Sequence, residues 1–196
     1  MSRTAFTRAE PDERRASLIA ATANVLAELG AAGVSVRAIS AEAGVSPGLL
    51  RHYFDGIDAL VAETYRAVGE RVSSALAEAV DAAEGPRARL AAYVTASFRA
   101  PIADPGLLAT WTAFWSLARS NPDIAALHGE IYGGYRAELE ALLRDCRLAE
   151  AQVRLAAVAM TALVDGLWLE LCLAPEAFTA EEASGIAERY LDMLLQ

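Results

Sequence analysis

Apolar residues recur every three or four positions along most of this chain, the spacing that gathers them on one face of an α-helix. Alternating runs of β-branched residues, which are typical of strands, are nearly absent. The first periodic segment covers residues 11–29, and Gly30 and Gly33 predict its end, because glycine commonly follows the last turn of a helix. The side chains expected on its buried face are Leu18, Thr22, Val25, Leu26 and Leu29.

Two short helices are predicted over residues 35–54, on either side of a tight turn at Gly44, where glycine accommodates a positive φ. Ser35 is a favourable N-cap for the first helix, and Ser46 followed by Pro47 begins the second. The side chains expected to fill the space between them are Ile39, Val45, Leu50 and Phe54. Two short helices joined by a glycine turn are typical of a helix-turn-helix, whose second helix enters the major groove of DNA.

Six longer helices are predicted in the rest of the chain, separated by breaks rich in proline and glycine. They cover residues 57–84, 86–98, 107–120, 122–147, 149–173 and 179–196. Thr179, with Glu182 three residues later, has the spacing of a capping box at the start of the last helix. The sequence therefore predicts an all-α fold of about nine helices.

The formal net charge of −9 taken alone argues against a nucleic-acid partner, but the charges are unevenly distributed. Residues 1–54 carry a net charge of +1 and residues 55–196 a net charge of −10, so the acidic residues lie away from the predicted helix-turn-helix. The apolar stretch 155–174 contains Asp165 and Glu170, which make a membrane span too costly. Because the N-terminus has no apolar signal core, we expect a cytoplasmic protein with no membrane partner.

The string AISAEAGVSPGLLRHYF, residues 38–54, resembles the TetR family of bacterial regulators, which place a small residue, an Ala-Gly-Val-Ser turn and a terminal Tyr-Phe at these positions. The resemblance covers residues 12–72. Farther along, WTAFW at 111–115 and DGLWL at 165–169 are similar to the BetI-like branch, whose best-known members respond to choline. The resemblance implies a ligand-responsive transcriptional regulator, a repressor that leaves its operator when a small molecule binds.

By this resemblance, the second short helix carries the surface that reads DNA. The residues implied to contact phosphates are Ser46, His52 and Tyr53, those implied to face base edges are Pro47, Gly48, Leu49 and Arg51, and Arg37 would meet a flanking phosphate or base. Arg51 can bind guanine through two hydrogen bonds. The alternative interpretation is that Arg51 forms an ordinary ion pair on the surface. Many relatives carry Lys where this chain has Ile57. The loss of one phosphate contact there lowers the slope of the salt dependence by about 0.9.

Aromatic residues and one carboxylate mark a candidate effector site in the second part of the chain. The candidate ligand-binding residues are Trp111, Phe114, Trp115, Tyr132, Asp165 and Trp168. Aromatic residues at helical spacing are more often plain core, but Asp165 lies in the most apolar helix, where a carboxylate needs a partner. That partner is an Arg or water, a backbone N–H or hydroxyl, or a cationic effector held by aromatic faces, which the BetI resemblance favours.

The last two helices are too apolar to face water, which predicts a homodimer. The residues that indicate it are Leu155, Val158, Ala162, Leu169 and Leu173 in one helix and Ile186, Tyr190, Met193 and Leu194 in the other. Gly166 is expected to let another helix approach closely. A two-fold dimer would match a pseudo-palindromic operator on double-stranded DNA.

These expectations divide the chain into a flexible arm over residues 1–10, a helix-turn-helix domain over 11–56, and a domain for ligand binding and dimerisation over 57–196. Two other functional classes remain as alternatives. One is a helical small-molecule-binding enzyme that uses Asp165 or His128, although no nucleophile–base pair, metal-ligand set or phosphate-binding loop is found. The other is an adaptor that binds proteins. We expect no catalytic site, metal or cofactor, and we interpret His128 as a packed or surface residue.

Overall fold

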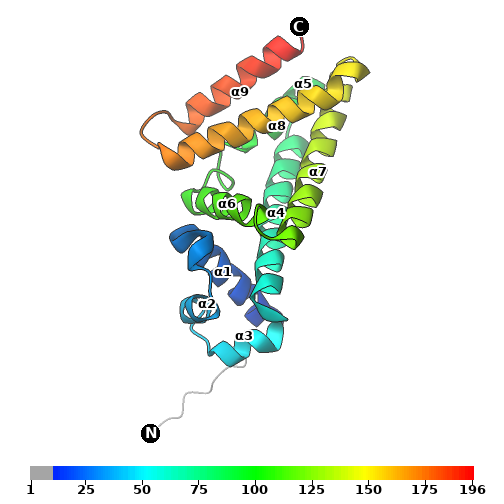
Figure 1. The fold of residues 1–196 in the computed structure, drawn as a ribbon. Helices are drawn as coiled ribbons and strands as arrows, with labels where there is room; N and C mark the ends of the chain where they lie inside the picture. Colours follow the sequence, from blue (N-terminus) through cyan, green and yellow to red (C-terminus); the bar gives the residue numbers. More distant parts are fainter. Residues whose placement is uncertain (1–10) are drawn as a thin grey trace.

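The computed structural model describes residues 11–196, so the predicted arm over residues 1–10 lies outside the described part of the chain. Over the described range the chain forms nine α-helices and no strand, as the sequence predicts (Figure 1). The helices are α1 (Pro11–Gly33), α2 (Val36–Glu42), α3 (Pro47–Tyr53), α4 (Gly56–Asp81), α5 (Pro86–Ala96), α6 (Pro105–Ala118), α7 (Pro122–Asp145), α8 (Glu150–Leu173) and α9 (Ala180–Leu194). We call α1–α3 the head and α5–α9 the body; the long α4 joins them (Figure 1).

The head has the predicted helix-turn-helix, and the local signals that predict it are present. The side chain of Ser35 accepts a hydrogen bond from the backbone N–H of Ala38 over 3.1 Å and so caps α2. Gly44 has a φ of +63°, the left-handed conformation that the turn requires. The core of the head consists of Leu18, Ala21, Val25, Ile39, Leu50, Phe54 and Leu60. The second helix of the motif is therefore held by its buried face, and its other face is left for solvent.

The end of α1 departs from the prediction at one residue. Gly30 has a φ of +65° and interrupts the helix where the sequence predicts its end. Leu29, expected on the buried face, is 56% exposed, so that expectation is wrong. Leu26 is the last fully buried residue of this face, and the helix is interrupted one turn later, at Gly30. A Cβ at Gly33 would lie 2.2 Å from the Cβ of Leu29, so only glycine fits there.

Two contacts join the head to the body. The first is α4, whose Leu60 packs in the core of the head while Val61 and Tyr65 pack in the core of the body. The second is the packing of α1 along α6, where the Thr110 hydroxyl lies 3.1 Å from the carbonyl oxygen of Ala23. A change in the body can therefore reach the head through two elements.

The last two helices lie at the end of the molecule farthest from α3 (Figure 1). The capping box at Thr179 and Glu182 is present, as predicted. Several of their apolar side chains face solvent in the single chain, the most exposed being Leu155, Val158, Leu173 and Met193. By length and composition alone, Asp12–Gly33 and Glu150–Leu173 could cross a membrane. Both helices pack on others in this fold, α1 on α6 and α8 on α7.

Candidate functional site

The helix α3 lies at the outer end of the head (Figure 1). Most of the residues assigned to DNA are accessible there. The exposed ones are Arg37, Ser46, Pro47, Gly48, Arg51 and His52, and the half-buried ones are Leu49 and Tyr53. Ser46 occupies the N-cap position of α3, but its side chain makes no capping hydrogen bond. Its hydroxyl is therefore free to bind another group, such as a phosphate.

Arg51 forms no ion pair with any residue in the described part of the chain. No acidic residue in the described part of the chain therefore forms the surface ion pair that was the alternative interpretation of Arg51. An exposed guanidinium on a short helix is free to approach a base edge or a phosphate. His52 and Tyr53 pack edge to face beside it, with ring centroids 5.1 Å apart.

Arg15, which the sequence analysis did not single out, fixes the end of α3. Its guanidinium donates a hydrogen bond to the carbonyl oxygen of Tyr53 over 3.2 Å and lies over the ring of Phe54, 4.6 Å from the centroid. It also forms an ion pair with Glu63 of α4 at 3.0 Å. One side chain of α1 thus connects the last residues of α3 to α4. An Arg in the first turns of a helix carries no sequence signal for such a role.

Ile57, at the start of α4, packs against the hydrophobic cores of both head and body. It therefore acts as a hydrophobic residue at the position where the family resemblance led us to expect a Lys. The first helical residues of α4 follow Asp55, whose side chain makes no capping hydrogen bond. The backbone N–H groups of this helix start can still bind a phosphate.

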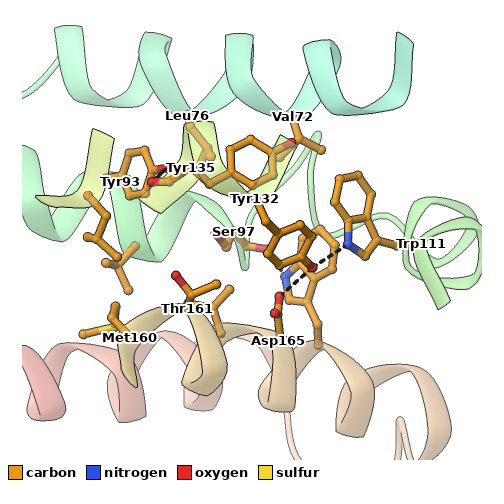
Figure 2. Close-up of a pocket in the computed structure, with 14 residues that line it drawn as sticks. Val72, Leu76, Tyr93, Ser97, Trp111, Tyr132, Tyr135, Met160, Thr161 and Asp165 are labelled. Carbon is orange, nitrogen blue, oxygen red and sulfur yellow. Dashed lines mark hydrogen bonds between the residues drawn. The ribbon is translucent and has the colours of Figure 1, made fainter. Parts of the chain in front are cut away.

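A cavity of about 60 Å³ lies inside the body, among α4, α5, α6, α7 and α8 (Figure 2). Its lining residues are Val72, Leu76, Tyr93, Val94, Ser97, Trp111, Tyr132, Tyr135, Leu139, Met160, Thr161, Val164, Asp165 and Trp168. Of the predicted ligand-binding residues, Trp111, Tyr132, Asp165 and Trp168 belong to this lining. The structure thus brings together side chains from three helices that the sequence could relate only by chemistry.

The other two predicted residues lie outside the lining. Phe114 is fully buried and stacks on Tyr65, with ring centroids 4.1 Å apart. Trp115 does not line the cavity but helps to position Tyr132, which does, because the indole N–H of Trp115 donates to the Tyr132 hydroxyl over 2.9 Å. Sequence reasoning missed Tyr93, Tyr135 and the aliphatic part of the lining, which look like ordinary core residues at helical spacing.

Tyr132 connects the aromatic side chains to the carboxylate. Its oxygen accepts hydrogen bonds from the indole N–H groups of Trp111 and Trp115, each over 2.9 Å. With these two donors directed at the oxygen, its own hydrogen points to Asp165, and the distance to Oδ1 is 3.1 Å (Figure 2). Of the partners considered for Asp165, the structure has a hydroxyl. Burial raises the pKa of Tyr132, so this hydroxyl stays protonated and acts as a donor.

Asp165 retains acceptor capacity toward the cavity. Its second oxygen, Oδ2, makes no hydrogen bond with the described residues, and it is not among the fully enclosed atoms that lack a partner. Burial raises the pKa of Asp165 from 3.8 to about 6, while the Tyr132 hydrogen bond and the charge of Arg136 act in the opposite direction. The carboxyl is therefore mostly ionised at pH 7, although burial opposes its charge.

The aromatic hydrogen-bond donors of the cavity are already used. The indole N–H of Trp168 donates to the carbonyl oxygen of Ser97 over 2.8 Å. The hydroxyl of Tyr93 donates to the carbonyl of Tyr135, and that of Tyr135 to the carbonyl of Gly69, each over 3.0 Å. These rings therefore offer a ligand their faces and edges but no N–H or O–H. Together with Asp165, that arrangement suits a cation and offers little to an anion.

His128 lies beside this network. Its Nδ1 is 2.8 Å from the Tyr65 hydroxyl, and its ring packs on Tyr132 with centroids 4.2 Å apart. Burial and the charge of Arg136 lower the pKa of His128, so the ring is neutral at pH 7. The described residues contain no group of three or more His, Cys, Asp or Glu side chains that could hold a metal ion.

Comparisons with known proteins agree with this geometry. Residues 18–64 match the bacterial regulatory proteins of the TetR family, and residues 86–196 match the C-terminal domain of the BetI-type transcriptional repressor. The regulator BetI of Burkholderia thailandensis is 35% identical over 187 residues, which cover 93% of each chain.

Solved structures have the same fold. A transcriptional regulator from Pseudomonas aeruginosa PAO1 is 46% identical, with a TM-score of 0.88 over 98% of this chain and 95% of its own. A regulator from Saccharomonospora viridis, solved in complex with choline, is 16% identical, with a TM-score of 0.82 over 92% of this chain and 96% of its own. This chain is therefore a member of the TetR family of ligand-responsive transcriptional regulators, with a C-terminal domain of the BetI type.

Proposed function

We propose that this protein is a cytoplasmic homodimeric repressor that reads a pseudo-palindromic operator with α3 and leaves it when an organic cation occupies the cavity. In this protein, residues 11–56 would form the helix-turn-helix domain, and residues 57–196 would form the domain for effector binding and dimerisation. The observation that carries it is the ionisable carboxylate of Asp165, directed into an aromatic cavity whose lining includes residues of α4 and α6, the two helices of the body side that contact the head.

The surface proposed for DNA is the exposed side of α3 with Arg37 of α2. Ser46, His52 and Tyr53 would bind phosphates, and Pro47, Gly48, Leu49 and Arg51 would face base edges. The exposure of Arg51 and the free Ser46 hydroxyl support this assignment. The family to which the chain belongs is not a family of enzymes, and we propose no catalytic role for Asp165 or His128.

The proposed dimer forms through α8 and α9. One face of α8 presents a mostly apolar row to solvent, with Leu155 60% and Leu173 68% exposed. Ala162 and Gly166 lie between them and are also exposed, and Glu170 is the charged residue near the end of the row. A Cβ built at Gly166 would meet no other atom of the described chain within 4 Å. The helix expected to approach Gly166 would therefore come from a second copy. A single chain leaves this row in water, and a two-fold partner would cover it.

Coupling between the effector and DNA would use α4 and α6. Val72 and Leu76 place α4 at the cavity wall, and α4 begins directly after α3. Trp111 of α6 lines the cavity too, and its neighbour Thr110 contacts α1. A cation that fits the cavity only after these helices shift would stabilise the form with a tilted head, because a ligand moves an equilibrium through its different affinity for the two forms.

Asp165→Asn tests the effector site. The amide keeps the acceptor for Tyr132 but has no charge, so binding of choline and of simple alkylamines is expected to fall at least tenfold, as measured by calorimetry. In the wild type the cation needs the ionised carboxylate, so affinity is expected to fall as the pH drops through about 6, the pKa of Asp165. The variant is expected to lack this pH dependence.

Asp165→Asn is also expected to stabilise the folded protein, although it weakens cation binding. A carboxyl with a raised pKa favours its protonated form in the folded state, so the free energy of unfolding decreases as the pH rises from about 4 to above 6. Asp165→Asn removes this cost and is expected to stabilise the empty protein at pH 7 by up to about 3 kcal/mol. Glu84→Gln, an exposed change in the connection between α4 and α5, is the control and should alter neither property. Equal cation binding by wild type and Asp165→Asn would remove the proposed effector site.

A further inference from the structure

The lining of the cavity changes in character along its length. Asp165, Tyr132 and Trp111 lie together at one end, and Met160, Leu76 and Tyr93 lie at the other (Figure 2). We call these the cation end and the aliphatic end. The aliphatic end also includes Leu139, which lies about two turns beyond Tyr132 along α7.

The directions of α7 and α8 explain this arrangement. The two helices pack on each other and are joined by a short connection at residues 146–149, so they run in opposite directions. Leu139 follows Tyr132 in sequence, whereas Met160 precedes Asp165. Both aliphatic residues are therefore displaced from the cation end in the same direction, toward the connection. The apolar part of the lining is continuous with the carboxylate and is not a separate pocket.

The hydroxyls at the aliphatic end are already used as donors, whereas that of Ser97, between the two ends, makes no hydrogen bond with the described residues (Figure 2). The hydroxyl of Thr161 donates to the carbonyl of Ala157 over 2.9 Å, and the hydroxyl of Tyr93 donates to the carbonyl of Tyr135. A small hydrophilic cation bound at Asp165 would leave this apolar surface in contact with water, at a cost that an apolar substituent would remove.

We infer that the effector is an amphiphilic monoamine, with its ammonium group at Asp165 and an aliphatic arm of about six carbons directed toward Met160. A six-carbon ligand such as benzene fits a cavity of about 150 Å³, so the cavity of about 60 Å³ has to widen for such an amine, by the same shift of α4 and α6 that would tilt the head. This inference rests on the proposed function and specifies the chemical class of its ligand. The length follows from the helix: Met160 lies five residues from Asp165, or about 7.5 Å along α8. Each carbon of an extended chain advances by roughly 1.25 Å.

The test is a series of n-alkylamines from propylamine to octylamine, with 1-hexanol as the uncharged control. Binding is measured at pH 7.5 by calorimetry and by tryptophan fluorescence, since two of the three Trp residues, Trp111 and Trp168, line the cavity. Affinity is expected to rise about fourfold per methylene, the equivalent of the roughly 0.8 kcal/mol for burying a methylene group. The total gain from propylamine to hexylamine is then roughly 60-fold, with a plateau beyond it. Hexanol should bind far more weakly than hexylamine.

Two variants localise the arm. Thr161→Leu extends an apolar side chain between the two ends and is expected to reduce the gain with chain length more than it reduces propylamine binding. Leu76→Ala enlarges the aliphatic end and is expected to move the plateau to longer amines. The second variant keeps the test valid should the first fail to fold.

The outcomes separate this inference from the proposed function. Binding of propylamine at Asp165 with no gain for longer amines would overturn the aliphatic arm and leave the cation site intact. Hexanol binding as tightly as hexylamine would overturn the role of the carboxylate in the inference. If no amine of any length binds, the proposed cation effector is wrong as well.

Discussion

Replacing both Arg51 and Tyr53 by Ala is expected to weaken operator binding at least about 30-fold while leaving the dimer folded. A guanidinium that binds guanine through two hydrogen bonds contributes about 1–3 kcal/mol, and a dimer would lose this contact at both half-sites. Both side chains lie on the accessible side of α3, and Arg51 has no ion-pair partner in the described chain. Removal of the Arg51 side chain therefore costs little stability, whereas Tyr53 is half-buried against the core of the head and its removal costs some. The measurement is a gel-shift titration on a DNA site selected by the wild-type protein from a random pool.

Arg119→Ala is the matched control, because Arg119 is an exposed Arg of the body, far along the chain from α3. It should bind the selected site as the wild type does. Circular dichroism and light scattering establish that the double variant is folded and has the same mass in solution. If a folded Arg51→Ala/Tyr53→Ala dimer binds the site with unchanged affinity, another surface reads the DNA.

A charge placed in the apolar row of α8 is expected to separate the dimer. Ala162 is exposed in the single chain and lies in the middle of the row, between Val158 and Gly166. Ala162→Glu leaves the fold of one chain unaffected, since Glu is a good helix former. In a two-fold dimer it would bury two uncompensated carboxylates. Light scattering should then report a monomer, and affinity for the selected operator should fall at least about 10³-fold toward the non-specific level.

Ala77→Glu makes the same change on the exposed side of α4 and should remain a dimer. The Ala162→Glu monomer should retain the helical content of the wild type. A stable Ala162→Glu dimer with full operator affinity would show that the two copies meet elsewhere.

The head was predictable because local chemistry determines it. Ser35, Gly44 and the buried residues Ile39 and Leu50 each have one physical role, and each role is evident from the residue type and its spacing. Leu29 is the exception, because it is exposed and not buried. Helical periodicity placed it on the buried face, but burial also depends on whether a neighbour covers that turn, which the periodicity does not tell.

The cavity could be predicted only in part. Asp165 was recognisable because a carboxylate within an apolar helix has to have a partner. The identity of that partner, the Tyr132 hydroxyl, depends on the packing of α7 against α8. Phe114 and Trp111 lie three residues apart on α6 and look alike in sequence, yet only Trp111 lines the cavity. The contacts of Arg15 with α3 and α4 could not be predicted from the sequence, since they join residues far apart in the chain.

Regulation by an effector requires that a cation in the cavity lowers the affinity of α3 for DNA. The most direct measurement is the operator affinity by fluorescence anisotropy, with and without a saturating concentration of choline or hexylamine, whichever binds more tightly. The wild-type affinity is predicted to fall 5- to 150-fold, a coupling of about 1–3 kcal/mol, and Asp165→Asn is predicted to bind DNA equally in both conditions. An unchanged wild-type affinity at saturation would contradict the account.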